Sequence, residues 1–159
     1  MNDREALIAI KNSLQTNLED PREQYTSVDR NWIHTDEPLT SATYPRIQVR
    51  KRGPTNTEVI SMGTEFLEWY AIIVDIQIWI KAPFKWDSDY SSGTYLQDEE
   101  LIKEYQDKIW VALKADQSDL KATYGIQGLK LLESDEPYQE AQSNLYTGTT
   151  SVRVWYFKR

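Results

Sequence analysis

The sequence predicts a single α+β domain over residues 1–159, in which an antiparallel or mixed β-sheet has an N-terminal helix and a second helix packed on one face. Apolar residues alternate with other types from 70 to 80, which is the period of a strand. Two other segments repeat apolar residues every three or four positions, which is the period of a helix. With 159 residues, no internal repeat and no linker-like segment, the chain has the size of one domain.

The first segment, from Asp3 to Leu18, is predicted to form an amphipathic helix. Its apolar stripe consists of Leu7, Ile10, Leu14 and Leu18. Asp3 and Glu5 lie at its start, where the helix dipole favours negative charge. Pro21 follows closely, so the helix is expected to end before it.

Residues 20–43 have no clear period and are expected to form a long loop, with a short extended piece near Asn31 to His34. After this loop, residues 46–51 alternate between apolar types and basic or polar types, which predicts a strand. Gly53-Pro54 is expected to end that strand, and a second short strand is expected from Thr57 to Met62.

The segment from 70 to 80 is the strongest strand in the sequence. Its even positions are Tyr70, Ile72, Val74, Ile76, Ile78 and Ile80. The opposite side includes Asp75 and Gln77 among apolar residues. One side is therefore expected to be buried and the other half solvated, as in the central strand of an antiparallel sheet that is covered on one side. β-branched residues dominate, which disfavours a helix.

The C-terminal half is expected to contain one helix and two strands. Residues 83–94 are predicted to form a polar loop that leads into a helix from about Tyr95 to Ala115. The apolar stripe of this helix consists of Leu101, Tyr105, Ile109 and Leu113. Strands are expected from Ile126 to Glu133 and from Val152 onward, with a long loop near 134–150 between them.

Composition excludes several classes of protein. Without cysteine the chain has no disulfide framework, no thiol catalysis and no thiolate zinc site, and it suits a reducing cytoplasm. A net charge of −7 gives no long-range attraction to nucleic acid. The longest apolar run, Trp69 to Ile80, contains Asp75 and is too short to cross a bilayer as a helix. The N-terminus lacks the basic and apolar pattern of a signal peptide, so we expect a soluble protein.

We expect no catalytic centre, no cofactor and no metal site. His34 is the only histidine, lies in a loop-like segment, and is not accompanied by a Gly-x-Ser-x-Gly motif. The segment from Asp87 to Ser91 resembles the start of a calcium loop, but Ser92 stands where the sharp turn requires glycine. The acids at 98–100 are explained by the dipole of the helix that they begin.

Basic and aromatic residues indicate an interaction surface. The chain has ten Tyr and six Trp but three Phe, and Tyr and Trp suit surfaces that are exposed in one state and buried in another. Arginines at even positions near the start of the sheet share one face of a strand. We assign to a subunit or channel interface Arg46, Arg50, Arg52, Trp69, Trp79 and Trp155. The alternative is a solvated outer face for the arginines and core positions for the aromatics.

The order of the segments forms a pattern of its own. An N-terminal helix and a variable loop precede Tyr44-Pro45-Arg46-Ile47-Gln48-Val49, and the strand that follows ends in Ile76-Gln77-Ile78-Trp79. The second helix and a late strand, Val152-Arg153-Val154-Trp155, complete the layout. This layout resembles the neck proteins of tailed viruses, the tail-terminator and tail-completion proteins.

The resemblance implies a structural virion protein without catalytic residues, which forms a ring, usually of six copies, that terminates the tail tube and joins it to the head connector. The implied partners are further copies of the chain, the tail tube protein and the head connector or stopper protein, with non-specific contact to packaged DNA as a further option and no membrane partner. The implied location is the virion neck, after assembly in the host cytoplasm. The alternatives are a head-side completion or connector protein and, from a different class, a binding module with an exposed aromatic platform.

Overall fold

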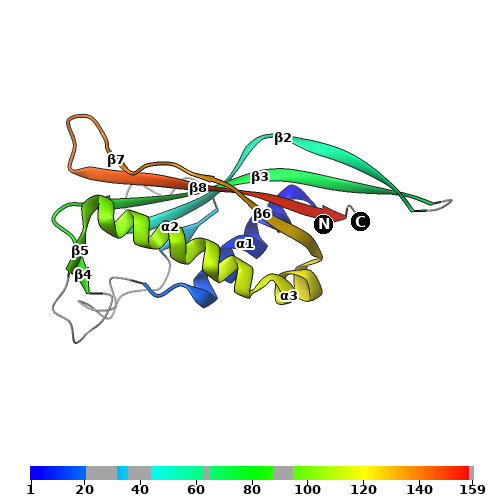
Figure 1. Cartoon of the computed structure of the whole chain (residues 1–159), viewed down its shortest axis with the longest axis horizontal. Coiled ribbons are helices and arrows are strands. Elements are labelled where there is room, and N and C mark those ends of the chain that lie inside the picture. The colour runs from blue at the N-terminus through cyan, green and yellow to red at the C-terminus, as the bar shows by residue number, and fades with distance from the viewer. Residues whose placement is uncertain (21–31, 36–43, 63–64, 88–94, 158–159) are drawn as a thin grey trace.

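The computed structural model describes residues 1–20, 32–35, 44–62, 65–87 and 95–157 (Figure 1). A layer of helices lies on a layer of strands, which confirms the predicted α+β class. The helical elements are α1 (Asp3–Asn17), α2 (Asp98–Ala115), the short α3 (Gln117–Asp119) and the π-helix η2 (Leu120–Tyr124). The strands are β1 (Ile33–His34), β2 (Arg46–Met62), β3 (Glu65–Lys81), β4 (Lys85–Asp87), β5 (Tyr95–Gln97), β6 (Ile126–Ser134), β7 (Tyr138–Gln139) and β8 (Leu145–Phe157).

The main sheet has the strand order β1-β2-β3-β8-β6, and β7 pairs with β8. β1 runs parallel to β2, whereas the other neighbouring strands of this sheet run antiparallel, so the sheet is mixed. β4 and β5 form a separate two-stranded sheet. The strand predicted at 70–80 belongs to β3 and lies in the middle of the main sheet.

Helices α1 and α2 cover one face of the main sheet (Figure 1). The even-numbered residues of β3 from Ile72 to Ile80 are fully buried on this face. β8 adds Val152, Val154 and Tyr156, because residues directly opposite each other in an antiparallel pair lie on the same side. The alternation in the sequence therefore builds the core, as predicted.

α1 begins with a reciprocal pair of hydrogen bonds. The backbone N–H of Glu5 donates to Asn2 Oδ1 at 2.9 Å, and the backbone N–H of Asn2 donates to Glu5 Oε2 at 2.9 Å. This capping box satisfies two N–H groups at the helix start. It assigns Glu5 a specific bonding role in addition to the dipole effect predicted from the sequence.

α2 buries the predicted stripe and lies unusually close to β8. It begins at Asp98 rather than near Tyr95, because residues 95–97 pair with β4 as strand β5. At Gly148 an added Cβ would lie 2.6 Å from Ile102 Cγ2. Glycine at this position therefore allows the helix and the strand to pack together.

β2 differs from the two short strands predicted. It is one strand from Arg46 to Met62, with an irregular register between Arg52 and Asn56. Gly53 has a φ of 67°, a conformation that favours glycine. A bulge adds residues to one strand without ending its pairing, so the turn residues Gly53-Pro54 mark a bulge and not a break.

The segments predicted as long loops contain strands. β1 lies in 20–43, within the short extended piece that was expected near Asn31 to His34, whereas β4 in 83–94 and β7 together with the first part of β8 in 134–150 were not expected. The last difference is the largest, because β8 begins at Leu145 and not at Val152. Three threonines between 147 and 150 made this stretch look like a polar loop, although threonine is β-branched and fits a strand. Residues 21–31, 36–43 and 88–94 lie outside the described residues.

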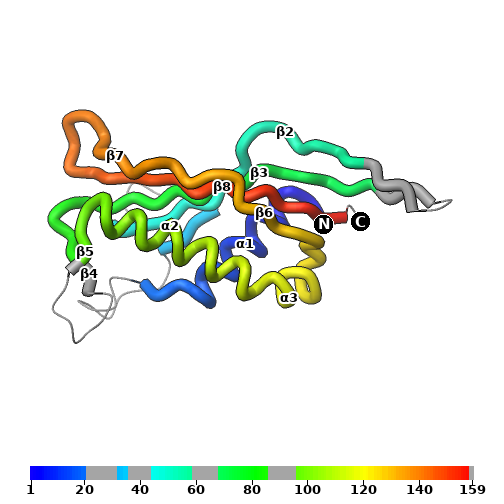
Figure 2. The backbone as a smooth tube through the Cα atoms, in the orientation of Figure 1, coloured from blue at the N-terminus to red at the C-terminus, as the bar shows by residue number. Residues whose placement is uncertain are grey.

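The chain path brings the start of α1 beside the end of β8 (Figure 2). The ammonium group of Met1 donates a hydrogen bond to the carbonyl oxygen of Phe157 at 3.3 Å. Near this point the hairpin of β2 and β3 continues past the helices, so that it projects from the body of the molecule (Figure 1).

Candidate interaction surface

The face of the main sheet opposite α1 and α2 is covered by no helix of the described chain, and we call it the open face (Figure 1). Its residues follow from the strand register, because direct antiparallel partners point to the same side. Its charged and aromatic members among the side chains that the structure describes on these strands are Arg46, Arg50, Arg52 and Glu58 of β2, Trp69, Asp75, Trp79 and Lys81 of β3, Lys130 and Glu133 of β6, and Arg153, Trp155 and Phe157 of β8. All six residues assigned to an interface from the sequence lie on the open face.

A buried carboxylate organises the centre of the open face. The side chain of Asp75 is 6% exposed and accepts hydrogen bonds from Arg52 Nε at 3.0 Å and from Ser151 Oγ at 2.9 Å. Arg52 also donates to the half-exposed Glu133 at 2.7 Å. The bonds to Glu133 and to Asp75 raise the pKa of the Arg52 guanidinium above its ordinary value. Arg50 lies 3.9 Å from Asp75, and half of its side chain faces solvent.

Aromatic rings gather at the end of the open face near the C-terminal end of β8. The rings of Trp69 and Phe157 pack edge to face with their centres 5.2 Å apart. Trp155 Nε1 donates to Glu58 at 3.1 Å, and Arg153 donates to the other oxygen of the same carboxylate. The guanidinium of Arg153 also lies 5.3 Å from the centre of the Trp155 ring. The rings are only partly buried, so apolar area remains open to solvent.

The opposite end of the open face combines an arginine with two further rings. The guanidinium of Arg46 lies 4.5 Å from the centre of the Tyr44 ring and 5.3 Å from that of Trp79, distances at which a cation is attracted to a ring face. Tyr138 of β7 is opposite Thr147, which is itself opposite Trp79, so Tyr138 belongs to the same face. Its side chain is 52% exposed.

The open face is basic although the chain is acidic. The members named above comprise six basic and three acidic side chains, a net charge of +3. The whole chain carries −7, so the remainder of the molecule carries −10. The described members of the open face therefore have the opposite net sign to the chain as a whole.

Part of the open face could be predicted from the sequence, and part of it could not. The even spacing of the arginines in β2 predicted their common face. The break expected at Gly53-Pro54 placed Glu58 in a separate predicted strand, so its position beside the arginines was not predicted. Arg153 and Phe157 share the odd positions of β8 with Trp155, so alternation was a usable signal for both. Only the strand register brings Glu58 to Trp155.

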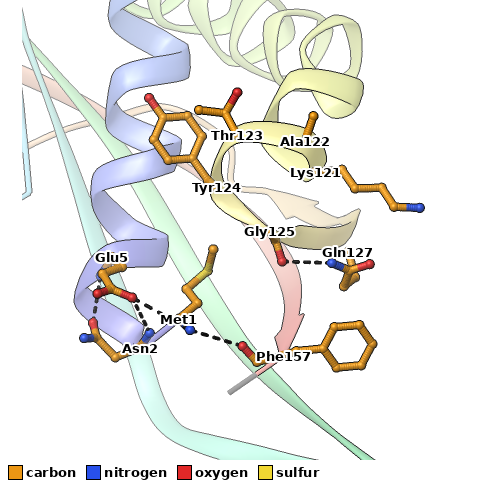
Figure 3. Close-up of a pocket in the computed structure, with 10 residues that line it drawn as sticks. All are labelled: Met1, Asn2, Glu5, Lys121, Ala122, Thr123, Tyr124, Gly125, Gln127 and Phe157. Carbon is orange, nitrogen blue, oxygen red and sulfur yellow. Dashed lines mark hydrogen bonds and ion pairs between the residues drawn. The ribbon is translucent and has the colours of Figure 1, made fainter. Parts of the chain in front are cut away.

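A pocket of about 620 Å³ lies between the start of α1, η2 and the end of β8 (Figure 3). Polar groups on its α1 side already bond within the chain, since Asn2 and Glu5 form the capping box and Met1 bonds to Phe157. Figure 3 shows the side chain of Lys121 extending away from α1. The lining residues include no histidine, and they form no pairing of a nucleophile with a base.

A second polar cluster joins the first turn of α1 to the sheet. The Asp3 carboxylate accepts hydrogen bonds from Lys51 Nζ at 2.6 Å, from Thr55 Oγ1 at 2.6 Å and from the Tyr156 hydroxyl. Burial opposes ionisation of Asp3, but the three hydrogen bonds outweigh it, so the pKa of this carboxyl lies below its usual value. Burial, together with the bond to Asp3, raises the pKa of Tyr156 above its ordinary value. The cluster holds α1 in place against β2 and β8.

Within the described residues, no group of three or more His, Asp or Glu side chains is placed to hold a metal ion. His34 lies on β1 opposite Gln48 and is half-buried. Most of the segment compared with a calcium loop, Asp87 to Ser91, lies outside the part of the chain that the structure describes. In that described part, no helix is long and apolar enough to span a membrane.

The chain matches no model of a known protein family, and it matches no curated protein. The geometry and charge of the open face therefore carry the functional inference.

Proposed function

We propose that this chain is a structural protein of the neck of a tailed virus, where it forms a ring that terminates the tail tube and joins it to the head connector. The observation that carries the proposal is the position of all six interface residues on one uncovered side of the sheet. The order of helix, sheet, helix and late strand on which the resemblance rests also supports it.

The composition of the open face favours a protein contact over a solvated surface. A sheet that is covered on one side usually has polar residues on the other side. Here Trp69, Trp79, Trp155 and Phe157 lie on the uncovered side among arginines. Aromatic residues and arginine are the types enriched at the centres of protein interfaces.

The proposed partners are further copies of the chain, the tail tube protein and the head connector or stopper protein. A closed ring needs two different surfaces on each copy, because each subunit contacts one neighbour on either side. A long sheet with one open face, and with a hairpin that projects from the body, offers more than one such surface.

The proposal is tested with the purified chain. Native mass spectrometry and negative-stain electron microscopy are expected to find a ring, with six copies as the expected number. The ring is expected to bind the ends of isolated tails. Binding to DNA-filled heads instead would favour the alternative, a head-side completion or connector protein. A chain that stays monomeric at high concentration and binds neither particle contradicts both.

The half-buried rings of Trp69, Trp155 and Phe157 favour a second candidate, a binding module that uses an aromatic platform. Stacking on such rings is one way in which proteins hold flat apolar ligand surfaces. Titration with glycans, followed by tryptophan fluorescence, tests this function. Saturable quenching by a monomeric protein would support the binding module, and an unchanged spectrum would exclude a glycan ligand from the set tested.

A further inference from the structure

The outer side of α2 has the opposite character to the open face. α2 buries Leu101, Tyr105, Ile109 and Leu113, so the residues about half a turn away face solvent. Three exposed residues on this outer side are separated by seven and four positions and therefore lie nearly in line along the helix. These residues, which we call the α2 ridge, are Glu100, Asp107 and Val111.

The α2 ridge has two acidic residues and ends in the apolar Val111, and the exposed Lys114 follows in the last turn of the helix. Val111 is 65% exposed, the highest value among the exposed large apolar side chains of the described chain. Two lysines beside the ridge are already engaged with acids of their own chain, Lys103 with Glu136 at 2.9 Å and Lys108 with Glu104 at 3.7 Å. Over its whole length α2 has five acidic and three basic residues.

We infer that the α2 ridge of one copy binds the open face of the next copy, so that the copies associate head to tail. This inference rests on the proposed ring. Acids of the ridge oppose the arginines of the open face, and Val111 opposes its half-buried rings. The helix then covers the uncovered side of the sheet, as helices do in layered folds.

The dimensions of the two surfaces agree. α2 has 18 residues and is roughly 27 Å long at 1.5 Å per residue. The open face runs along β3 from Trp69 to Trp79, which is roughly 33 Å at 3.3 Å per residue. The helix is shorter than the face and therefore fits between its two aromatic ends.

Charge decides between the two ways in which copies could meet. If two open faces met, a surface of +3 would oppose an identical surface, and like charges brought together across an interface are unfavourable. The ridge lies on the part of the molecule that carries −10. A contact between two different surfaces also leaves each copy with one free face and one free ridge, which allows a ring to close.

The experiment uses three variants of the full chain. The face variant combines Arg50→Glu with Lys130→Glu, and the ridge variant combines Glu100→Lys with Asp107→Lys. Each is expected to weaken association about tenfold or more, because it places like charges together. The third variant combines all four substitutions, which restores opposite charges across the contact. It is expected to assemble within a few-fold of the wild-type dissociation constant, measured by mass photometry over a concentration series.

Circular dichroism and thermal melts establish that each variant is folded. Because Arg50 lies near Asp75, the face variant has a substitute, Lys81→Glu with Lys130→Glu, whose altered side chains are both exposed. A ridge variant that assembles like the wild type overturns the inference. So does a variant with all four substitutions whose association is as weak as that of the face variant or the ridge variant. Neither of these two outcomes contradicts the proposed ring. A wild-type chain that is monomeric contradicts the proposed function.

Duplex DNA is the other occupant that the charge of the open face permits. Its binding is measured by fluorescence anisotropy on the wild type and the face variant. Loss of DNA binding in a face variant that still assembles would assign the open face to DNA and overturn the contact between copies. Assembly that is lost and restored as described, without measurable DNA binding by the wild type, supports it.

Discussion

Asp75 places a nearly buried negative charge on a side of the sheet that the chain itself leaves uncovered. Its charge is balanced by Arg52, which also reaches the half-exposed Glu133. Asp75 and Glu133 bind the same guanidinium, one from a buried and one from an exposed position. Their substitution therefore compares the stability that a buried and an exposed ion pair contribute.

The change Asp75→Asn is expected to lower the free energy of unfolding by about 2–3 kcal/mol, because it weakens hydrogen bonds to a charged group where water cannot replace them. The change Glu133→Gln is expected to cost less than about 1 kcal/mol, because that carboxylate is exposed to solvent. Urea unfolding of the two variants measures both values. Equal losses would show that burial does not strengthen the central pair.

Asp3 predicts a dependence of stability on pH. Its pKa is lowered in the folded chain, so the stability that it contributes is present above the unfolded value of about 3.9 and is lost as the pH falls through the folded value. At pH 7 the change Asp3→Asn is expected to cost about 1–2 kcal/mol through lost hydrogen bonds. The difference between wild type and variant is expected to disappear in strongly acidic solution.

Urea titrations at several pH values measure this difference, with the exposed Asp119→Asn as the control. A difference that stays constant from neutral to strongly acidic pH would show that the Asp3 carboxylate is not the group involved.

Tyr156 affects stability at alkaline pH, because its pKa is raised in the folded chain. Its contribution is present below about pH 10 and declines as the pH rises above that value.

At this scale the sequence predicted the apolar positions but not the polar contacts. The even-numbered isoleucines of β3 were placed in the core correctly, because strand alternation depends on neighbours in the chain alone. The partners of Asp75 lie on β2 and β8. Pairing across strands depends on register, which a single segment does not contain.

Among the elements, the contact between α2 and β8 depends on the absence of one side chain. The change Gly148→Ala is expected to destabilise the fold by about 1–3 kcal/mol, because the new methyl group overlaps Ile102 and forces the helix outward. In the double variant with Ile102→Ala, the methyl group gains space. The loss is then expected to be smaller than the sum of the two single losses, as determined by urea unfolding of all four proteins. Additive losses would place the strain elsewhere.

Long periodic elements were predicted better than irregular ones. α1, α2 and the centre of β3 have clear periods and lie close to their predicted positions. The bulge in β2 looked like a break, because Gly53-Pro54 has the chemistry of a turn. Residues 145–150 looked like a loop, because only pairing with β3 and β7 shows that their polar side chains belong to a sheet.

For the whole molecule, association that depends on charge is expected to weaken with salt. Raising the ionic strength shortens the screening length from about 8 Å at 0.15 M to about 3 Å at 1 M. The dissociation constant between copies is therefore expected to rise about tenfold or more over this range, measured by mass photometry. In the control Val111→Ala, association is expected to weaken at every salt concentration while its salt dependence stays unchanged. Tighter association at high salt would point to a mainly apolar contact.

The candidate surface was predictable in outline because its arginines and tryptophans follow the strand period. What the sequence could not supply is the sum of charge on each side of the sheet. Lys130 and Glu133 lie on the open face only because β6 pairs with β8 at the edge of the sheet. Their charges cancel each other, so the positive sign of that face comes from β2, β3 and β8, whose residues share a side only through the pairing of these strands.

The separation of a basic sheet face from an acidic remainder gives each copy a permanent electric dipole moment. Two such molecules orient each other in solution before they touch, and electrostatic steering of this kind accelerates productive encounters. In the proposed ring, copies would therefore meet mostly in the arrangement in which the positive end of one faces the negative end of another. The charge that selects the proposed contact would thus also raise the rate at which it forms.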